Sequence, residues 1–244
     1  RSVYLFLIVV LSLGLLFEWS SEKKEAAVKS HLLEVGLPGY EMRDGFVVLE
    51  NEKLRVVVEA QTGYIVETRI KEHLVENVDG SLGYRVFGSS EDSAFNYYFK
   101  SGFEGTPDPS YEVVGVGPGF VELRDESRGL SKRISFLERD YEISILDTSS
   151  NMGDGRAFAS LRRTEGKALD LKRDALSGGM MNNGSYEGVA ISHDADPYET
   201  YRLKNLDEKQ ERLSKSGGWV GFIQKYFFAA IIGSDNNIHR YFAA

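Results

Sequence analysis

The 244-residue sequence contains no cysteine, only five prolines and only four histidines. Without cysteine the chain has no disulfide, no thiolate metal site and no cysteine nucleophile. The histidines are scattered and form no closely spaced pair of ligands, so we predict no metal site and no cofactor. They are His31, His73, His193 and His239. Basic residues are also outnumbered by acidic ones. The chain has 29 Lys and Arg against 37 Asp and Glu, which gives a formal net charge of -8. This balance argues against a nucleic acid as the main partner, since phosphate binding needs a basic face.

Catalytic motifs are absent as well. The sequence has no G-x-S-x-G, no phosphate-binding glycine loop before a helix and no H-E-x-x-H. The segment GVGPG at 115–119 joins two predicted strands and contains Pro118, so we interpret it as a hairpin turn. His193 lies beside Asp194 and Asp196, which a sugar-active enzyme could use as acid and base. A solvated polar loop is the alternative, and we predict that the chain is not an enzyme.

An apolar run without a charge spans Val3 to Phe17. A run of about 15 residues is short for a spanning helix, which needs about 20, and lies at the upper end of the length of a signal-peptide core. Glu18 and Trp19 stand where a cleavage site would need small residues, and Tyr4 and Trp19 bracket the run as aromatic residues do at membrane interfaces. We therefore predict a retained membrane anchor, with a cleaved signal or a buried core helix as alternatives. Its residues are Val3, Tyr4, Leu5, Phe6, Leu16, Phe17 and Trp19.

The charges beside this run do not settle its orientation. Arg1 precedes the run, whereas Lys23, Lys24 and Lys29 follow it. By the positive-inside rule, the residues after the run would lie in the cytoplasm. A long folded domain crosses a membrane largely regardless of charge, so the sequence alone leaves the orientation open.

From Gly45 onward, short apolar runs alternate with turn residues about every 10 residues, which predicts an antiparallel all-β domain. One face should carry Leu54, Val56 and Val58, and the next run suggests a face made of Tyr64, Val66, Thr68 and Ile70. Hairpin turns are predicted at Gly63, at 118–119 and at 139–140. In the third hairpin, the residues expected to face inward are Ile134, Phe136, Ile143 and Ile145.

Two aromatic segments stand out within this β pattern. FNYYF at 95–99 could line a binding cleft for peptide or sugar, or form a strand with one buried face. Its aromatic residues are Phe95, Tyr97, Tyr98 and Phe99. GGWVGFIQKYFFAAII at 217–232 is too short and too rich in glycine for a spanning helix. Its aromatic and β-branched residues favour strand, bend and strand, with both faces largely buried.

The segment 217–232 resembles the end of the periplasmic domain in the YidC family of membrane protein insertases. The matching residues are Gly218, Trp219, Val220, Gln224, Tyr226, Phe227 and Ala229. Residues 48–73 resemble the first periplasmic strands of that family, and the N-terminal apolar run fits its first membrane helix. The family usually has proline after the Ala-rich run, where this chain has Gly233.

The resemblance implies a β-supersandwich of the galactose mutarotase-like type, preceded by one transmembrane helix. Residues 1–20 would be the anchor, 21–44 a linker or short helix, and 45–244 the β-supersandwich, incomplete at its C-terminus. The N-terminus would be cytoplasmic and the β-domain periplasmic, at the bacterial inner membrane. The family's five-helix insertase core has no counterpart in this sequence, so no residue is assigned to the insertion step.

The function implied by the resemblance is that of an N-terminal portion of a membrane protein insertase and chaperone. Its implied partners are nascent membrane proteins, the Sec translocon with its SecDF complex, and the lipid bilayer. One alternative is a membrane-anchored carbohydrate-binding or mutarotase-like protein, which would need His73 or His193 to converge with acidic residues in one cleft. Another alternative is a purely structural role that braces neighbouring subunits.

Overall fold

The computed structural model describes residues 39–73, 83–89, 95–137, 141–151, 155–165, 187–192, 198–202, 211–224, 227–234 and 238–243. Every regular element in these ranges is a β-strand, so the predicted all-β class is confirmed there. Helices long and apolar enough to cross a bilayer do not occur in these ranges. The predicted anchor, residues 1–20, lies outside them.

The first sheet has seven strands, in the order β1-β2-β3-β4-β6-β11, with β5 paired to β4. Its first strand begins at Gly39, so β-structure starts ahead of the predicted boundary at residue 45. The strands are β1 (Gly39–Arg43), β2 (Phe46–Glu50), β3 (Leu54–Glu59), β4 (Tyr64–Ile70), β5 (Tyr84–Phe87), β6 (Phe95–Phe103) and β11 (Ala157–Glu165).

The second sheet is an antiparallel meander of β7 (Glu112–Gly117), β8 (Phe120–Asp125), β9 (Leu130–Phe136) and β10 (Ile143–Ser149). Two predicted hairpins turn at glycines with positive φ, Gly63 at 67° and Gly119 at 81°. Such backbone suits glycine because it has no Cβ. In the third hairpin, Ile134 pairs with Ile145 and Phe136 with Ile143, as the alternation predicted.

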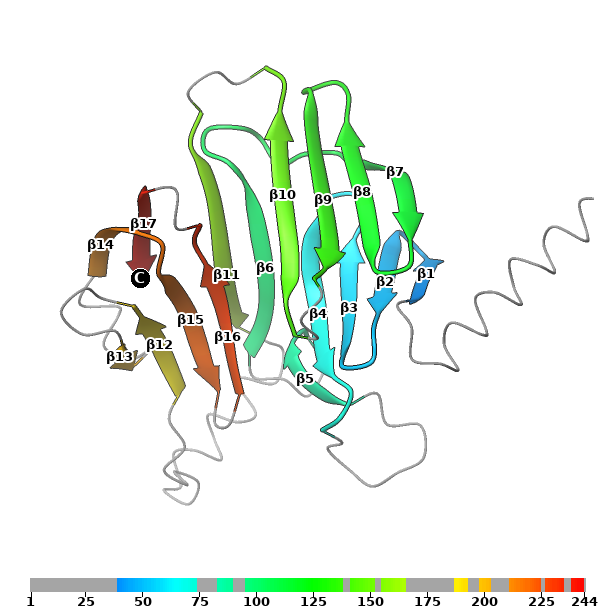
Figure 1. Cartoon of the computed structure of the whole chain (residues 1–244). Helices are drawn as coiled ribbons and strands as arrows, with labels where there is room; N and C mark the ends of the chain where they lie inside the picture. The colour runs from blue at the N-terminus through cyan, green and yellow to red at the C-terminus, as the bar shows by residue number, and fades with distance from the viewer. Residues whose placement is uncertain are drawn as a thin grey trace, which may run out of the picture.

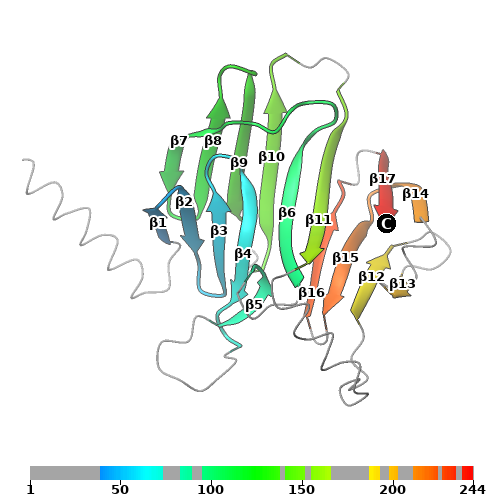
Figure 2. The same ribbon diagram turned by 180° about the vertical axis from the view of Figure 1, so that it is seen from behind.

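The two sheets pack face to face, one behind the other in Figures 1 and 2. Their core is mainly aliphatic, with the two aromatic residues Phe99 and Tyr111. The aliphatic residues are Val47, Leu49, Leu54, Val56, Val58, Ile65, Val121, Leu123, Leu130 and Ile134. The prediction for β3 is confirmed. For β4 it is wrong in part, because Ile65 is buried together with Thr68. The register between β3 and β4 shifts at Val57/Val58, and such an irregularity breaks strict alternation.

The C-terminal strands form a sheet in the order β13-β12-β15-β16 and a separate pair, β14-β17. They are β12 (Glu187–Ile191), β13 (Glu199–Arg202), β14 (Glu211–Ser216), β15 (Trp219–Gln224), β16 (Phe227–Ile232) and β17 (Ile238–Ala243). The strand, bend and strand predicted for 217–232 are therefore β15 and β16. Burial of both faces is wrong for β16, because Phe228 is 47% and Ile232 67% exposed. The reason is that β16 is the edge strand of its sheet and packs on one face only.

A buried lysine crosses the interior of the sandwich. The Lys132 ammonium lies 2.8 Å from Asp147 Oδ1 and donates to Ser101 Oγ at 2.6 Å, so it joins β9, β10 and β6. Ser101 Oγ in turn donates to Asp147 Oδ2 at 2.5 Å. Burial lowers the pKa of Lys132, and the Asp147 carboxylate opposes that shift. A side chain at Gly63 would strike the Lys132 stem, because a Cβ there would lie 2.8 Å from Cδ.

A second buried acid, Asp125, closes the turn after β8. Its carboxylate accepts bonds from Ser127 Oγ at 2.5 Å, from the Ser110 amide at 3.0 Å and from the Arg128 guanidinium at 2.6 Å. These bonds, that from Ser127 first, hold the pKa of Asp125 well below its ordinary value.

Asp125→Asn is expected to flatten the fall of stability in acid. In the unfolded chain an aspartate titrates near pH ~4. Below that pH the unfolded wild-type chain gains this proton before the folded one does, so the free energy of unfolding falls as the pH drops. The asparagine variant should lack this part of the slope in urea unfolding between about pH 5 and pH 2.5. Glu126→Gln, at an exposed neighbouring acid, is the control. Equal slopes for wild type and Asp125→Asn would contradict the assignment.

Candidate binding groove

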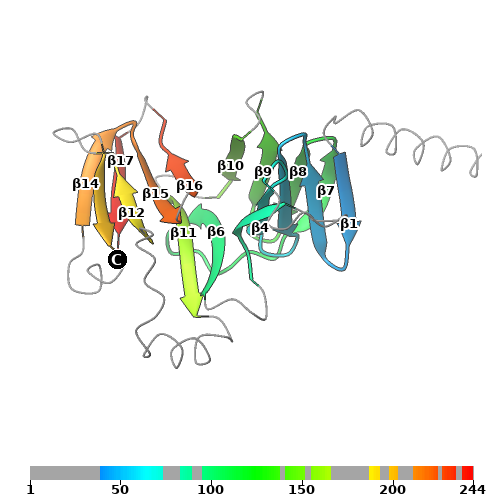
Figure 3. The same cartoon turned by 90° about the horizontal axis from the view of Figure 1, so that it is seen from below.

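A groove lies between β10 of the second sheet and β16 of the C-terminal sheet. Figure 3 shows these two strands from below. Its cavity has a volume of about 580 Å³. We define the groove by its floor, Val86, Phe87, Phe99 and Leu161, and by two walls, Ile143, Ile145 and Leu146 on β10 and Phe228, Ile231 and Ile232 on β16. The floor belongs to β5, β6 and β11 of the first sheet, where Val86, Phe87 and Phe99 are buried and Leu161 is half-buried. These side chains are apolar, and Thr68, Ser101, Tyr141, Asp147 and His239 line the same cavity. The groove therefore offers apolar surface with polar groups among it, as binding sites commonly do.

The β10 wall is held in place from both ends. Before the strand, Tyr141 Oη donates to Glu72 Oε2 at 2.5 Å, and Lys53 also pairs with Glu72. Hydrogen bonds from Lys53 and then from Tyr141 lower the pKa of Glu72. Farther along, Asp147 is bound to Lys132. Between these anchors Leu146 is 60% exposed at the rim of the groove.

The β16 wall is positioned by aromatic contacts of Trp219 and Phe227, two of the residues on which the resemblance to the YidC family rests. Phe227 stacks on Tyr84 with ring centroids 3.9 Å apart and lies 5.5 Å from His73, which connects β16 to the first sheet. Trp219 meets Phe228 edge to face at 5.1 Å. The Gly218 carbonyl accepts the Gly233 amide at 2.9 Å.

Glycine at 221 allows β15 and β16 to pair closely, because a Cβ there would collide with the Ala229 carbonyl. Val220 pairs with Ile231, and Phe222 with Ala229, in the same hairpin. Tyr226 and the side chain of Gln224 lie outside the described residues. Among the described matched residues, Ala229 lines the groove, while Trp219 and Phe227 hold β16 in place through ring contacts.

The predicted aromatic segment 95–99 does not form a single surface. Tyr97 meets Phe222 at 5.8 Å, whereas Tyr98 stacks on Tyr64 at 5.9 Å. Phe99 is buried and lines the groove. The side chain of Phe95 lies outside the described residues. Alternation along β6 explains the split, because neighbouring side chains in a strand point to opposite faces.

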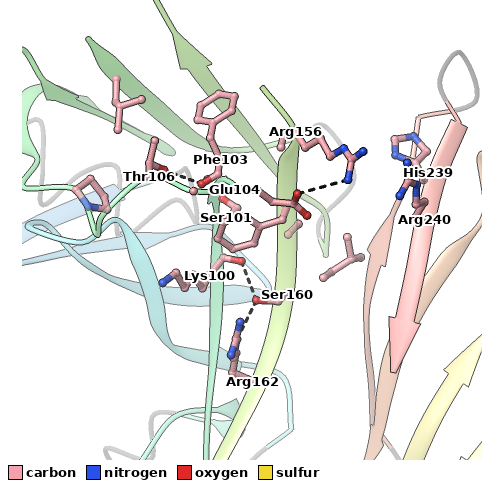
Figure 4. A pocket seen from close by; sticks show the side chains of 18 of the residues that line it. Lys100, Ser101, Phe103, Glu104, Thr106, Arg156, Ser160, Arg162, His239 and Arg240 are labelled. Carbon is pink, nitrogen blue, oxygen red and sulfur yellow. Dashed lines mark hydrogen bonds and ion pairs between the residues drawn. The ribbon is translucent and has the colours of Figure 1, made fainter. Parts of the chain in front are cut away.

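A second cavity of about 810 Å³ adjoins the groove and shares Ser101, Ala159, Ile231 and His239 with it. Figure 4 shows side chains that line this cavity. The residues that line the cavity include more basic than acidic side chains. The basic ones are Lys100, Arg156, Arg162 and Arg240, and the acidic ones are Glu104 and Asp108. In a chain with a net charge of -8, the groove thus continues into a locally basic cavity.

Lys100 and Asp108 form the best-defined ion pair of this second cavity, at 2.7 Å. Tyr64 Oη also donates to Asp108, at 3.0 Å. The bond to Asp108 raises the pKa of Lys100, and the bond from Lys100 lowers the pKa of Asp108. Both groups therefore remain charged at neutral pH. Arg156 reaches Glu104 at 4.0 Å, and Arg162 Nε donates to Ser160 Oγ at 3.3 Å.

The described residues give no support to catalysis. Ser101 Oγ lies near an amine, but its proton is directed to Asp147, and the same carboxylate favours the charged form of Lys132. His73 packs against Phe227, and the acid next to it, Glu72, is bound to Lys53 and Tyr141. His193 and its acidic neighbours lie outside the described residues. Where the chain is described, no group of His, Asp and Glu is arranged to hold a metal ion.

A model of the YidC periplasmic domain matches residues 47–244, so the chain belongs to the YidC periplasmic domain family. A membrane protein insertase YidC of Pseudomonas putida is 25% identical over 214 residues, which cover 78% of this chain and 37% of that protein. The relative in Marinobacter nauticus is 24% identical over 214 residues, covering 79% and 36%. A protein from another Pseudomonas putida strain is 32% identical over 126 residues, covering 48% and 21%.

These matches confirm the family predicted from residues 48–73 and 217–232. The family is one of insertases and not of enzymes, in agreement with the sequence prediction. The chain spans little more than a third of the length of the relatives it matches, at most 37% of each in these alignments.

Proposed function

We propose that this chain is the N-terminal portion of a membrane protein insertase and chaperone of the bacterial inner membrane. Family membership supports the proposal, and the relatives are named membrane protein insertases. In this proposal residues 1–20 anchor the chain, the N-terminus is cytoplasmic, and the β-domain is a periplasmic supersandwich of the galactose mutarotase-like type. Its partners are nascent membrane proteins, the Sec translocon with SecDF, and the lipid bilayer.

Within the insertase, the role of this domain is to bind extended segments of polypeptide in the groove. The observation that carries this role is the apolar groove between β10 and β16, at whose rim Leu146 and Ile232 are 60% and 67% exposed. Nascent membrane proteins are rich in apolar segments, which leave water for such a surface. The adjoining basic cavity would accept acidic residues that flank an apolar segment.

Depletion of the full-length protein tests the insertase role. Loss of the protein should leave newly made inner-membrane proteins uninserted, as measured by protease accessibility of their periplasmic loops. Re-expression of the wild-type protein should restore insertion. Normal insertion after depletion would overturn the proposal.

A further inference from the structure

We propose that the groove binds its polypeptide as an added β-strand, through main-chain hydrogen bonds to the outer edge of β10. This inference rests on the groove's proposed role as a polypeptide site and specifies how it recognises a segment. It predicts that recognition depends on extended backbone and alternating apolar side chains rather than on one sequence.

The register of β10 shows which of its backbone groups face the groove. Leu137 N bonds to Glu142 O at 3.1 Å before the strand, and Ser150 N bonds to Gly129 O at 2.9 Å after it. Between these bonds the pairing of β10 with β9 is unbroken. Hydrogen-bonded and non-hydrogen-bonded pairs alternate in antiparallel sheets. The backbone N–H and C=O of Ile143, Ile145 and Asp147 therefore point away from β9, toward the groove.

The edges that face the groove lack the usual protection against added strands. Natural sheets protect edges with charges, prolines or bulges. In β7, the opposite edge of the same sheet, the register shifts between Val113 and Gly115. In the first sheet, the edge strand β11 carries Arg162 and Arg163. By contrast, β10 has an unbroken register, no proline and one charge, Asp147, which is bound inward to Lys132.

The neighbouring surface also fits a strand beside β10. A strand added there would continue the second sheet beyond β10, toward the first-sheet strand β11, where Leu161 lines the groove and is half-buried. One set of alternate side chains would pack on that floor, and the other set would lie beside Leu146. Strand β16 also presents an open edge to the groove, at Phe228, Ala230 and Ile232, because Gly233 N bonds to Gly218 O. We assign the pairing to β10 because only that arrangement continues the sandwich.

Backbone-modified peptides test the inference with the full chain in detergent micelles. The probe is an acetylated heptapeptide that alternates valine and threonine, followed by two glutamates. Methylating the backbone nitrogens of one residue type should weaken binding by at least about tenfold, while methylating the other type should leave it nearly unchanged. The reason is that only one alternate set of N–H groups can face β10. Equal effects of the two modifications would overturn edge pairing. If the unmodified peptide does not bind, the groove's role as a polypeptide site fails as well.

Amide exchange measured by NMR identifies the strand that pairs. Adding the unmodified peptide should slow exchange at Ile143, Ile145 and Asp147. The amides of Ser144 and Leu146 already face β9 and should change little. Protection that appears only at Phe228, Ala230 and Ile232 would place the peptide on β16 and overturn the assignment. Slow exchange at Ile143 and Ile145 before peptide is added would show that the chain covers its own edge, which also overturns it.

Discussion

Replacing Lys132 with methionine is expected to lower the free energy of unfolding by about 3–5 kcal/mol. The methionine keeps most of the apolar stem but removes the ammonium, which leaves the Asp147 carboxylate, 10% exposed, without its cation. Ser101 also loses the donor that binds its hydroxyl and carbonyl oxygens. Urea unfolding of the full chain, followed by fluorescence or circular dichroism, measures the change.

Two further variants show that the loss comes from the unpaired charge. Arg133 follows Lys132 in the same strand, but its ion pair with Glu122 is exposed. Exposed pairs contribute about 0–1 kcal/mol, so Arg133→Met should cost no more than about 1 kcal/mol. Adding Asp147→Leu to Lys132→Met should restore part of the stability, because a buried pair replaced by apolar residues is often nearly neutral. A decrease in the free energy of unfolding of less than about 1 kcal/mol for Lys132→Met would contradict a buried ion pair between Lys132 and Asp147.

Replacing Leu146 with glutamate is expected to weaken the binding of an extended apolar peptide by about tenfold or more. The change places a carboxylate at the rim of an apolar groove, where binding would remove it from water. Fluorescence anisotropy of a labelled valine–threonine peptide measures the affinity. Leu146 is 60% exposed, so the substitution should change the free energy of unfolding by only about 0.5 kcal/mol.

Val114 provides the matched control for Leu146. It is 50% exposed and lies on β7, the opposite edge strand of the same sheet. Val114→Glu adds the same charge at a similar exposure, away from the groove, and should leave peptide affinity unchanged. If both variants weaken binding equally, the effect is one of net charge and not of the groove. Unchanged affinity in Leu146→Glu would remove β10 from the binding surface.

Local pattern was sufficient to predict several hairpins of this domain, since a hairpin depends on nearby turn residues and on alternation within short runs. The turns at Gly63 and Gly119 and the inward set on β9 and β10 are of this kind. The alternation predicted for Tyr64 and Val66 was wrong in part, because the register shift at Val57/Val58 has no mark in composition.

The groove could not be predicted, because it depends on which edges of two separate sheets face each other. Phe228 and Ile232 look like core residues in the sequence and become a wall only because β16 is an edge strand. One missed feature did have a signal. Once Ile134 is paired with Ile145, Lys132 falls opposite Asp147 on the inward-facing set. The pairing of a buried lysine with an aspartate was therefore contained in the predicted hairpin.

Photo-cross-linking in living cells tests most directly whether the groove of this insertase domain receives polypeptide. A photoreactive phenylalanine analogue would replace Leu146 or, as a control, Val114 in the full-length protein. We expect adducts with newly made membrane proteins from position 146 and essentially none from position 114. Failure to form adducts from position 146, or equal yields from both positions, would contradict the account.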